Sequence, residues 1–211
     1  MEKSLPKKSG NGWHQGNVMG EIEDLIAALS PVAAALEKHS IPWFVGGSVA
    51  TSFHGASRST MDVDLVAELP VELVEELLNE LGDEYYGSHQ AAKEAVNRVS
   101  CFNLIHLPTS FKVDLFISRR RPFDREAMSR ATKGTIGDGD GLTVRITTAE
   151  DAIIAKLEWY RLGNEQSQRQ WQDVTRVLSL LGEQADWEYL KSAARSVGVA
   201  DLLQRLEKQQ S

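Results

Sequence analysis

The segment from Trp43 to Val66, WFVGGSVATSFHGASRSTMDVDLV, restricts the fold of this chain more than any other. It opens with the short β-prone run Trp43–Val45, which stops at Gly46 and Gly47. Glycine permits a sharp turn there and lets backbone N–H groups approach a ligand. Ser48 follows at a position typical of a helix N-cap. The order predicts a strand, a tight turn, a short helix and, after a loop, a second strand.

The end of this segment alternates apolar and acidic residues. As a strand it places Met61, Val63 and Leu65 on one face and both Asp62 and Asp64 on the other. The two acids lie about 7 Å apart and repel each other. A magnesium ion would compensate this charge, since Mg²⁺ takes one or two carboxylates and completes its shell with water and phosphates. A solvated acidic face of a half-exposed strand is the alternative.

The glycine turn and the acidic strand together suit a nucleoside triphosphate, because N–H groups and a hydroxyl can meet phosphate while carboxylates hold its metal. The segment resembles the nucleotidyltransferase fold of the DNA polymerase β superfamily. That motif has Gly-Gly or Gly-Ser on a short helix and then hydrophobic-Asp-hydrophobic-Asp-hydrophobic on a strand. Its positions are occupied here by Gly46, Gly47, Ser48, Asp62 and Asp64. The resemblance implies an α/β (α+β) fold with a mixed sheet, flanking helices and a C-terminal helical region.

A third carboxylate on a later strand is also implied by the resemblance, and Asp114 in the run Phe111–Ile117 fits that place. An acid inside a β-prone apolar run needs a partner or an open edge. An ion pair with Lys112 or a nearby arginine is therefore the alternative to a metal site. We expect Asp62, Asp64 and Asp114 to meet on one face.

Composition is that of an ordinary globular chain: 211 residues, 42% hydrophobic and 25% charged. We expect a cytoplasmic protein without a membrane partner, because no run has the length of a membrane span and the N-terminus lacks the order of a signal peptide. The single Cys101 excludes an internal disulfide framework and a multi-cysteine zinc site. It is expected to be a small core residue.

The net charge of −7 argues against non-specific binding to the phosphate backbone of nucleic acids. A local basic patch remains, since Arg119–Arg121 directly follows the strand of Asp114. This run is either a solvated loop or a dock for RNA or another anionic acceptor.

Three regions are expected along the chain: a flexible leader at 1–18, an α/β domain at 19–147 and a helical domain at 148–211. Pro31 should break or kink the helix expected at Glu21–Lys38. Asp138 and Asp140 are read as turn residues rather than calcium ligands. Further helices are predicted at 71–81, 88–98, 123–131, 148–163, 168–181, 187–197 and 200–209, and strands at 101–107, 111–117, 135–136 and 142–146.

The order Thr-x-Glu-Asp, then Lys156, then Asp173 resembles the C-terminal portion of AbiEii-type nucleotidyltransferase toxins, although only one acid of their Asp-x-x-Asp pair is present. The resemblance implies that Lys156 contacts the triphosphate and that Asp173 supports the site. A snorkelling lysine and a helix-surface ion pair are the alternative. Arg58 and Thr60 match the Arg-x-Thr-x-Asp-x-Asp form of that group, and Arg58 would reach a phosphate or fix the carboxylate strand.

The implied activity is metal-assisted transfer of a nucleoside monophosphate from an NTP, with pyrophosphate released. Asp62, Asp64 and Asp114 would hold Mg²⁺, or Mn²⁺ in its place, while Gly47 and Ser48 bind the β- and γ-phosphates. Asp114 would also help to deprotonate the acceptor hydroxyl.

The acceptor stays open in the sequence. A hydroxyl on RNA or protein is favoured, in a toxin-like component with a cognate antitoxin protein, and an aminoglycoside-type small molecule is the alternative. A third hypothesis is a non-catalytic binding module of the same fold in a toxin–antitoxin or regulatory complex.

Overall fold

The computed structural model describes residues 13–54, 62–137 and 141–210. The predictions for Arg58, Thr60, Met61, Asp138 and Asp140 lie outside these residues. Among the helices of the described ranges, none is both long enough and apolar enough to cross a lipid bilayer.

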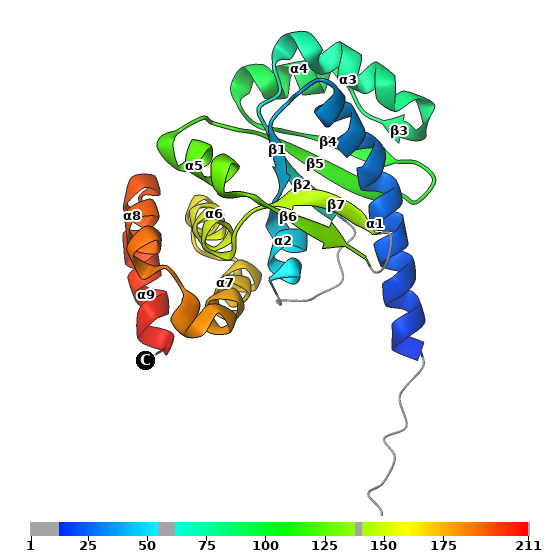
Figure 1. Cartoon of the computed structure of the whole chain (residues 1–211). Coiled ribbons are helices and arrows are strands. Elements are labelled where there is room, and N and C mark those ends of the chain that lie inside the picture. The colour runs from blue at the N-terminus through cyan, green and yellow to red at the C-terminus, as the bar shows by residue number, and fades with distance from the viewer. Residues whose placement is uncertain (1–12, 55–61, 138–140, 211) are drawn as a thin grey trace, which may run out of the picture.

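Within these ranges seven strands form one mixed sheet in the order β3-β4-β5-β2-β1-β7-β6 (Figure 1). The strands are β1 Trp43–Val45, β2 Asp62–Ala67, β3 Tyr85–Tyr86, β4 Cys101–His106, β5 Phe111–Ile117, β6 Thr132–Ile136 and β7 Leu142–Ile146. β2 and β5 are parallel neighbours, and so are β1 and β7. The other neighbouring pairs are antiparallel. The acidic strand β2 therefore lies in the middle of the sheet, beside the strand that carries Asp114.

Helices precede, connect and follow the strands. They are α1 Trp13–Lys38, α2 Gly47–Phe53, α3 Val74–Leu81, α4 His89–Arg98, α5 Pro122–Arg130, α6 Ala149–Leu162, α7 Gln168–Leu181, α8 Trp187–Val197 and α9 Ala200–Gln210. Four of them begin at a side chain that accepts a backbone N–H of the first turn, namely Ser88, Thr148, Ser167 and Asp186. Such caps satisfy a donor that has no partner inside the helix, which fixes where the helix starts.

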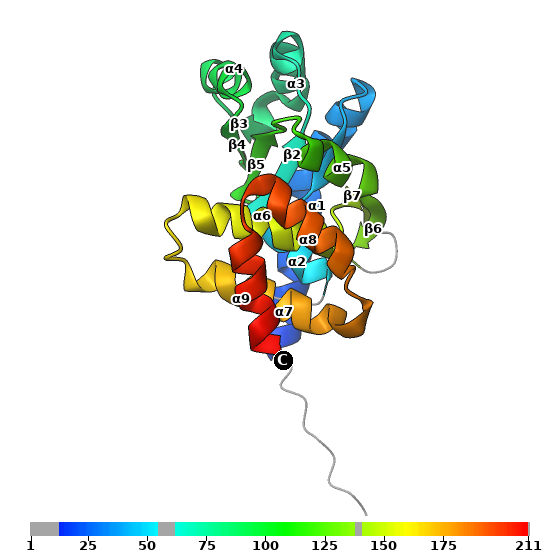
Figure 2. The ribbon, with the colours of Figure 1, turned by 90° about the vertical axis from the view of Figure 1, so that its left-hand side faces the viewer.

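Two hydrophobic cores lie on the two faces of the sheet. α1, α3 and α4 cover one face, where Val63, Leu65 and Val113 are buried. The helices from α5 to α9 cover the other face, over Phe44, and Figure 2 shows α6 to α9 in front of the sheet. The alternation of β2 is sorted as predicted, with Val63 and Leu65 in the first core and Asp62 and Asp64 on the face of the C-terminal helices.

The N-terminal helix differs from the prediction in two ways. It begins at Trp13, so residues 13–18 are helical rather than part of a flexible leader, and it continues through Pro31. Leu29 and Val32 on either side of the proline are fully buried, so packing on the sheet outweighs the lost backbone hydrogen bond.

The expected boundary near residue 147 does not separate the two cores. α5 precedes it in sequence, yet Phe123, Ala127 and Met128 pack in the same core as α6 to α9. The division of the chain into two domains stays a prediction.

Candidate functional site

The strand register brings the predicted carboxylates onto one face of the sheet. Asp64 of β2 lies directly opposite Asp114 of β5, and Asn103 of β4 lies on the other side of Asp114. Asp62 lies opposite Lys112. Because residues two apart in a strand share a face, these five side chains form two adjacent polar rows.

The glycine turn packs directly against this cluster. Gly47 has a φ of +54°, and a Cβ there would overlap the Asp64 carboxylate and lie 2.7 Å from the Cβ of Asp64. The Gly46 amide donates to the Asp64 carbonyl at 2.8 Å. The backbone N–H of Ser48 donates to the Asp64 carboxylate. A glycine is thus required at position 47 because the acid occupies the space of a side chain.

The cap of α2 differs from the prediction. Its N-cap residue is Gly46, and Ser48 lies inside the first turn, where its side chain is buried. The sharp turn at Gly47 starts the helix two residues earlier than the N-cap preference of serine indicates.

Electrostatics single out Asp64 within the cluster. Burial, followed by repulsion from Asp62 and Asp114, raises the pKa of Asp64 to about 6, against the opposing effects of the Ser48 N–H and Lys156. Asp114 is buried and accepts a hydrogen bond from the Asn103 amide. Its Oδ2 lies 2.6 Å from Lys112 Nζ, and this contact raises the pKa of Lys112. The ion pair that was the alternative for Asp114 therefore forms.

A cation fits this donor set, though not as a closed protein site. Within the described ranges no three His, Cys, Asp or Glu side chains meet to hold a metal ion. Asp64 nevertheless lies half-buried beside Asp62 and Asp114, and carboxylate oxygens are hard ligands. Mg²⁺ needs only one or two of them when substrate phosphate supplies the rest. The residues thus suit an ion that is shared with a phosphate.

Lys156 approaches the cluster from the C-terminal helices. Its Nζ lies 2.9 Å from Asp173 Oδ2, which joins α6 to α7, and the two side chains are only 12% and 13% exposed. Lys156 also lowers the pKa of Asp64 and lines a cavity together with Gly46 and Gly47. The ion pair is therefore enclosed rather than superficial, and its lysine belongs to the site.

That cavity, about 540 Å³ in volume, lies between the sheet and helices α5 and α6, and is called here the central cavity. One end is formed by Gly46, Gly47, Asp64 and Lys156. The remainder is lined largely by apolar side chains, among them Phe44, Val66, Cys101, Phe116, Phe123 and Trp159. Sequence reasoning missed it, although the alternation Asp62-Asp64-Val66 and Lys112-Asp114-Phe116 places apolar residues on the same face as the acids.

The three arginines of the run Arg119–Arg121 all form ion pairs with acidic side chains. Glu158 Oε1 lies 2.8 Å from Arg119 and 2.6 Å from Arg121. Arg121 also pairs with Asp124, and Arg120 lies 3.2 Å from Glu68. The contacts with Glu158 and Asp124 raise the pKa of Arg121. The run therefore lies on the surface, with Arg119 and Arg120 exposed, but its positive charges are compensated by Glu158, Asp124 and Glu68.

Cys101 lies on the floor of the central cavity, half-buried, and not in the core as predicted. Burial, with smaller effects of Asp114 and Asp64, raises the pKa of its thiol to about 12. The thiol is therefore protonated at neutral pH, which makes it a poor nucleophile.

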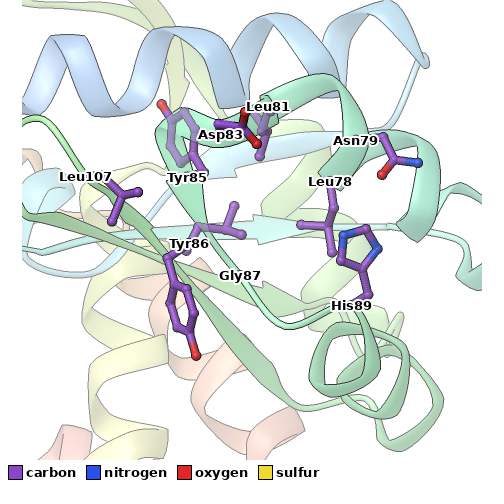
Figure 3. A pocket seen from close by; sticks show the side chains of 11 residues that line it. Leu78, Asn79, Leu81, Asp83, Tyr85, Tyr86, Gly87, His89 and Leu107 are labelled. Atoms are coloured by element: carbon purple, nitrogen blue, oxygen red, sulfur yellow. The ribbon is translucent and has the colours of Figure 1, made fainter.

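A second cavity of about 370 Å³ lies at the β3 edge of the sheet, and Figure 3 shows the side chains around it. The Tyr85 hydroxyl beside it donates to the Ala28 carbonyl at 2.8 Å, and His89 lies 2.7 Å from Glu75. None of the predicted site residues within the described ranges lines this second cavity.

The pKa of Asp64 predicts a pH dependence of stability for the metal-free protein. The folded state binds this proton more tightly than the unfolded state, so the free energy of unfolding should fall as the pH rises from 3.8 to about 6. The Asp64→Asn variant has no such proton to lose. The gain in its free energy of unfolding over wild type should therefore be about 2 kcal/mol larger at pH 7 than at pH 4. Urea unfolding in EDTA at both pH values checks this. If the free energy of unfolding changed by the same amount between pH 4 and pH 7 in wild type and variant, the prediction would be contradicted.

Comparisons with known proteins identify the fold. No protein-family model matches the sequence, and no curated protein does either. An antigenic nucleotidyltransferase-like protein from Paracoccidioides brasiliensis has a similar structure, with a TM-score of 0.52 at 19% identity over 89% of this chain and 93% of that one. ANT(2″)-Ia in complex with adenylyl-2″-tobramycin matches with a TM-score of 0.50 at 17% identity, over 82% of this chain and 97% of that one.

These likenesses confirm the predicted nucleotidyltransferase-type fold. The finer resemblance to AbiEii-type toxins stays a prediction from the sequence.

Proposed function

We propose that this protein is a metal-dependent nucleotidyltransferase, which moves a nucleoside monophosphate from an NTP to an acceptor hydroxyl and releases pyrophosphate. One observation carries the proposal: Asp64 and Asp114 lie opposite each other on parallel strands, with Gly47 packed against Asp64. The solved structures of similar fold, one of which contains an adenylylated aminoglycoside, support the same class of reaction.

A bound Mg²⁺ or Mn²⁺ ion, held by one or two of the carboxylates Asp62, Asp64 and Asp114 together with phosphate oxygens, would neutralise phosphate charge and make the α-phosphorus easier to attack. Lys156 would bind a phosphate oxygen of the triphosphate, exchanging its contact with Asp173 for the more highly charged ligand. Gly46 and Gly47 would line the phosphate end of the central cavity, whereas the buried Ser48 donates its N–H to Asp64.

Asp114 would accept the proton of the acceptor hydroxyl as that oxygen attacks the α-phosphorus. Its carboxylate is held in place by the Asn103 amide and by Lys112.

For the acceptor we propose a hydroxyl on a small molecule. The sequence favoured RNA or protein, but the arginines on which an RNA dock would depend already pair with Glu158, Asp124 and Glu68. Neither a toxin-like role nor an antitoxin partner has support in the structure, and both stay sequence predictions. Transfer from α-labelled NTPs into fractionated cell extract should label the small-molecule fraction, whereas label confined to RNA or protein would contradict the assignment.

Lys156→Met is expected to weaken NTP binding by roughly 10- to 100-fold, because a hydrogen bond between charged groups contributes about 1.5–3 kcal/mol. Lys191→Met is the matched control, since Lys191 pairs with Glu207 between α8 and α9 and does not line the central cavity. Calorimetric titration with magnesium and NTP measures both variants. Equal affinities would remove Lys156 from the site.

A non-catalytic binding module is the second candidate. It is favoured by the ion pair of Lys112 with Asp114, which occupies a carboxylate that the reaction needs. Metal-dependent NTP binding without pyrophosphate release, in the presence of a complete cell extract, would support this module over the enzyme.

A further inference from the structure

We infer that the central cavity binds the acceptor, and that the acceptor is an uncharged molecule in which an apolar ring lies next to the hydroxyl-bearing group. This inference rests on the proposed function, because it assigns the substrate class of the same site.

The floor of the cavity is an apolar row directly beside the carboxylates. Phe116 lies opposite Cys101 on one side and Val66 on the other, and Val66 lies opposite Phe44. Phe116 lies two residues after Asp114 on β5, and Val66 lies two residues after Asp64 on β2. Same-face residues at this spacing are about 7 Å apart. A ring on this floor therefore brings a hydroxyl-bearing group next to it within reach of Asp114.

The walls of the cavity are apolar like its floor. Phe123 and Ala127 come from α5, and Ala152, Ala155 and Trp159 come from α6. Trp159 is 45% exposed and meets Phe116 edge to face, with ring centroids 5.6 Å apart. An uncovered indole next to an apolar floor provides a stacking surface for a planar or cyclic ligand.

The charged side chains around this apolar part already have partners. Glu158 pairs with Arg119 and Arg121, and Asp124 pairs with Arg121. Asp151 is 1% exposed and pairs with Arg130 at 3.1 Å while accepting from the Tyr189 and Thr148 hydroxyls. In the described part of the lining, the cavity thus presents neither a carboxylate surface for a polycation nor a cationic surface for a polyanion.

The size of the cavity agrees with a small molecule. Its volume of about 540 Å³ falls in the usual range of small-molecule sites, and its Asp64 and Lys156 end is assigned to the triphosphate. The apolar part is left for the acceptor.

Three probes separate the chemical classes, each titrated into the full chain with magnesium and α,β-methylene-ATP. Phenyl β-glucoside joins an uncharged phenyl ring to a sugar that carries the hydroxyls, glucose has the hydroxyls alone, and tobramycin is a polycation. We expect phenyl glucoside to bind at least about tenfold more tightly than glucose, and more tightly than tobramycin. Trp159→Ala should weaken the binding of phenyl glucoside by about tenfold, because the aromatic contact and the buried apolar area are lost.

Leu162→Ala is the matched control, because Leu162 lies on the same helix, is 55% exposed and does not line the cavity. It should leave the affinity unchanged. Preference for tobramycin, or equal effects of the two substitutions, would overturn the inference while NTP binding still supported the enzyme. Displacement of phenyl glucoside by the ATP analogue would overturn it by assigning the apolar part to the nucleobase. Glucoside binding without any NTP binding would remove the proposed function, and the acceptor assignment with it.

Discussion

Asp64→Asn is expected to reduce nucleotidyl transfer by about 10³-fold, because a metal site of this kind contributes several kcal/mol to charge stabilisation in the transition state. Asparagine keeps the shape of the side chain and removes the charge that lies between Gly47, Ser48 and Asp114. The measurement is pyrophosphate release from NTP, with a cell extract as the source of acceptor.

This loss should occur in a protein that is folded and no less stable than wild type. Removal of the repelled charge raises the free energy of unfolding at neutral pH, so circular dichroism and urea unfolding distinguish a lost function from a lost fold. Asp83→Asn, at an exposed aspartate far along the chain from the cluster, should keep the wild-type rate. If Asp64→Asn kept that rate too, Asp64 would have no part in the chemistry.

Gly47→Ala is expected to reduce transfer by roughly 10²-fold, the effect of displacing a catalytic group by about 1 Å. The new methyl group would overlap the Asp64 carboxylate, which would have to leave the first turn of α2. The positive φ of +54° adds about 1–2 kcal/mol of strain for a residue with a Cβ. Both the rate of pyrophosphate release and the free energy of unfolding should therefore fall.

Gly198→Ala separates strain from displacement. Gly198 has a positive φ of +77° in the left-handed region, and a Cβ there would meet nothing within 4 Å. We expect it to lose about 1–2 kcal/mol of stability and to keep full activity. Equal rates in the two alanine variants would contradict the account of Gly47, because the strain is common to both.

Local patterns predicted much of the fold. β5, α7 and α8 have the predicted bounds, and β7 does as well. Helical periodicity, together with caps such as Ser167 and Asp186, fixed the two helices. The period of two sorted the acids of β2 onto one face. Short strands without a pattern were not predicted, as β3 with only Tyr85 and Tyr86 illustrates.

Features that depend on distant residues could not be predicted. Glu158 neutralises arginines 37 and 39 positions earlier in the chain, and no local signal links them. The meeting of Asp64 with Asp114 was expected from the resemblance alone, because no local pattern shows that β2 and β5 become parallel neighbours. The apolar part of the central cavity forms only where α5 and α6 pack above the strand residues of its floor. In the sequence, a single apolar residue that lines a cavity looks the same as one buried in the core.

The most direct test of the central claim is calorimetric titration of magnesium with each of the four NTPs into the wild-type protein and the Asp62→Asn/Asp64→Asn variant. It requires no knowledge of the acceptor. The account predicts NTP binding that depends on magnesium in the wild type and is lost in the variant. Equal binding by both proteins, or no binding of any NTP by the wild type, would contradict a nucleotidyltransferase site at these carboxylates.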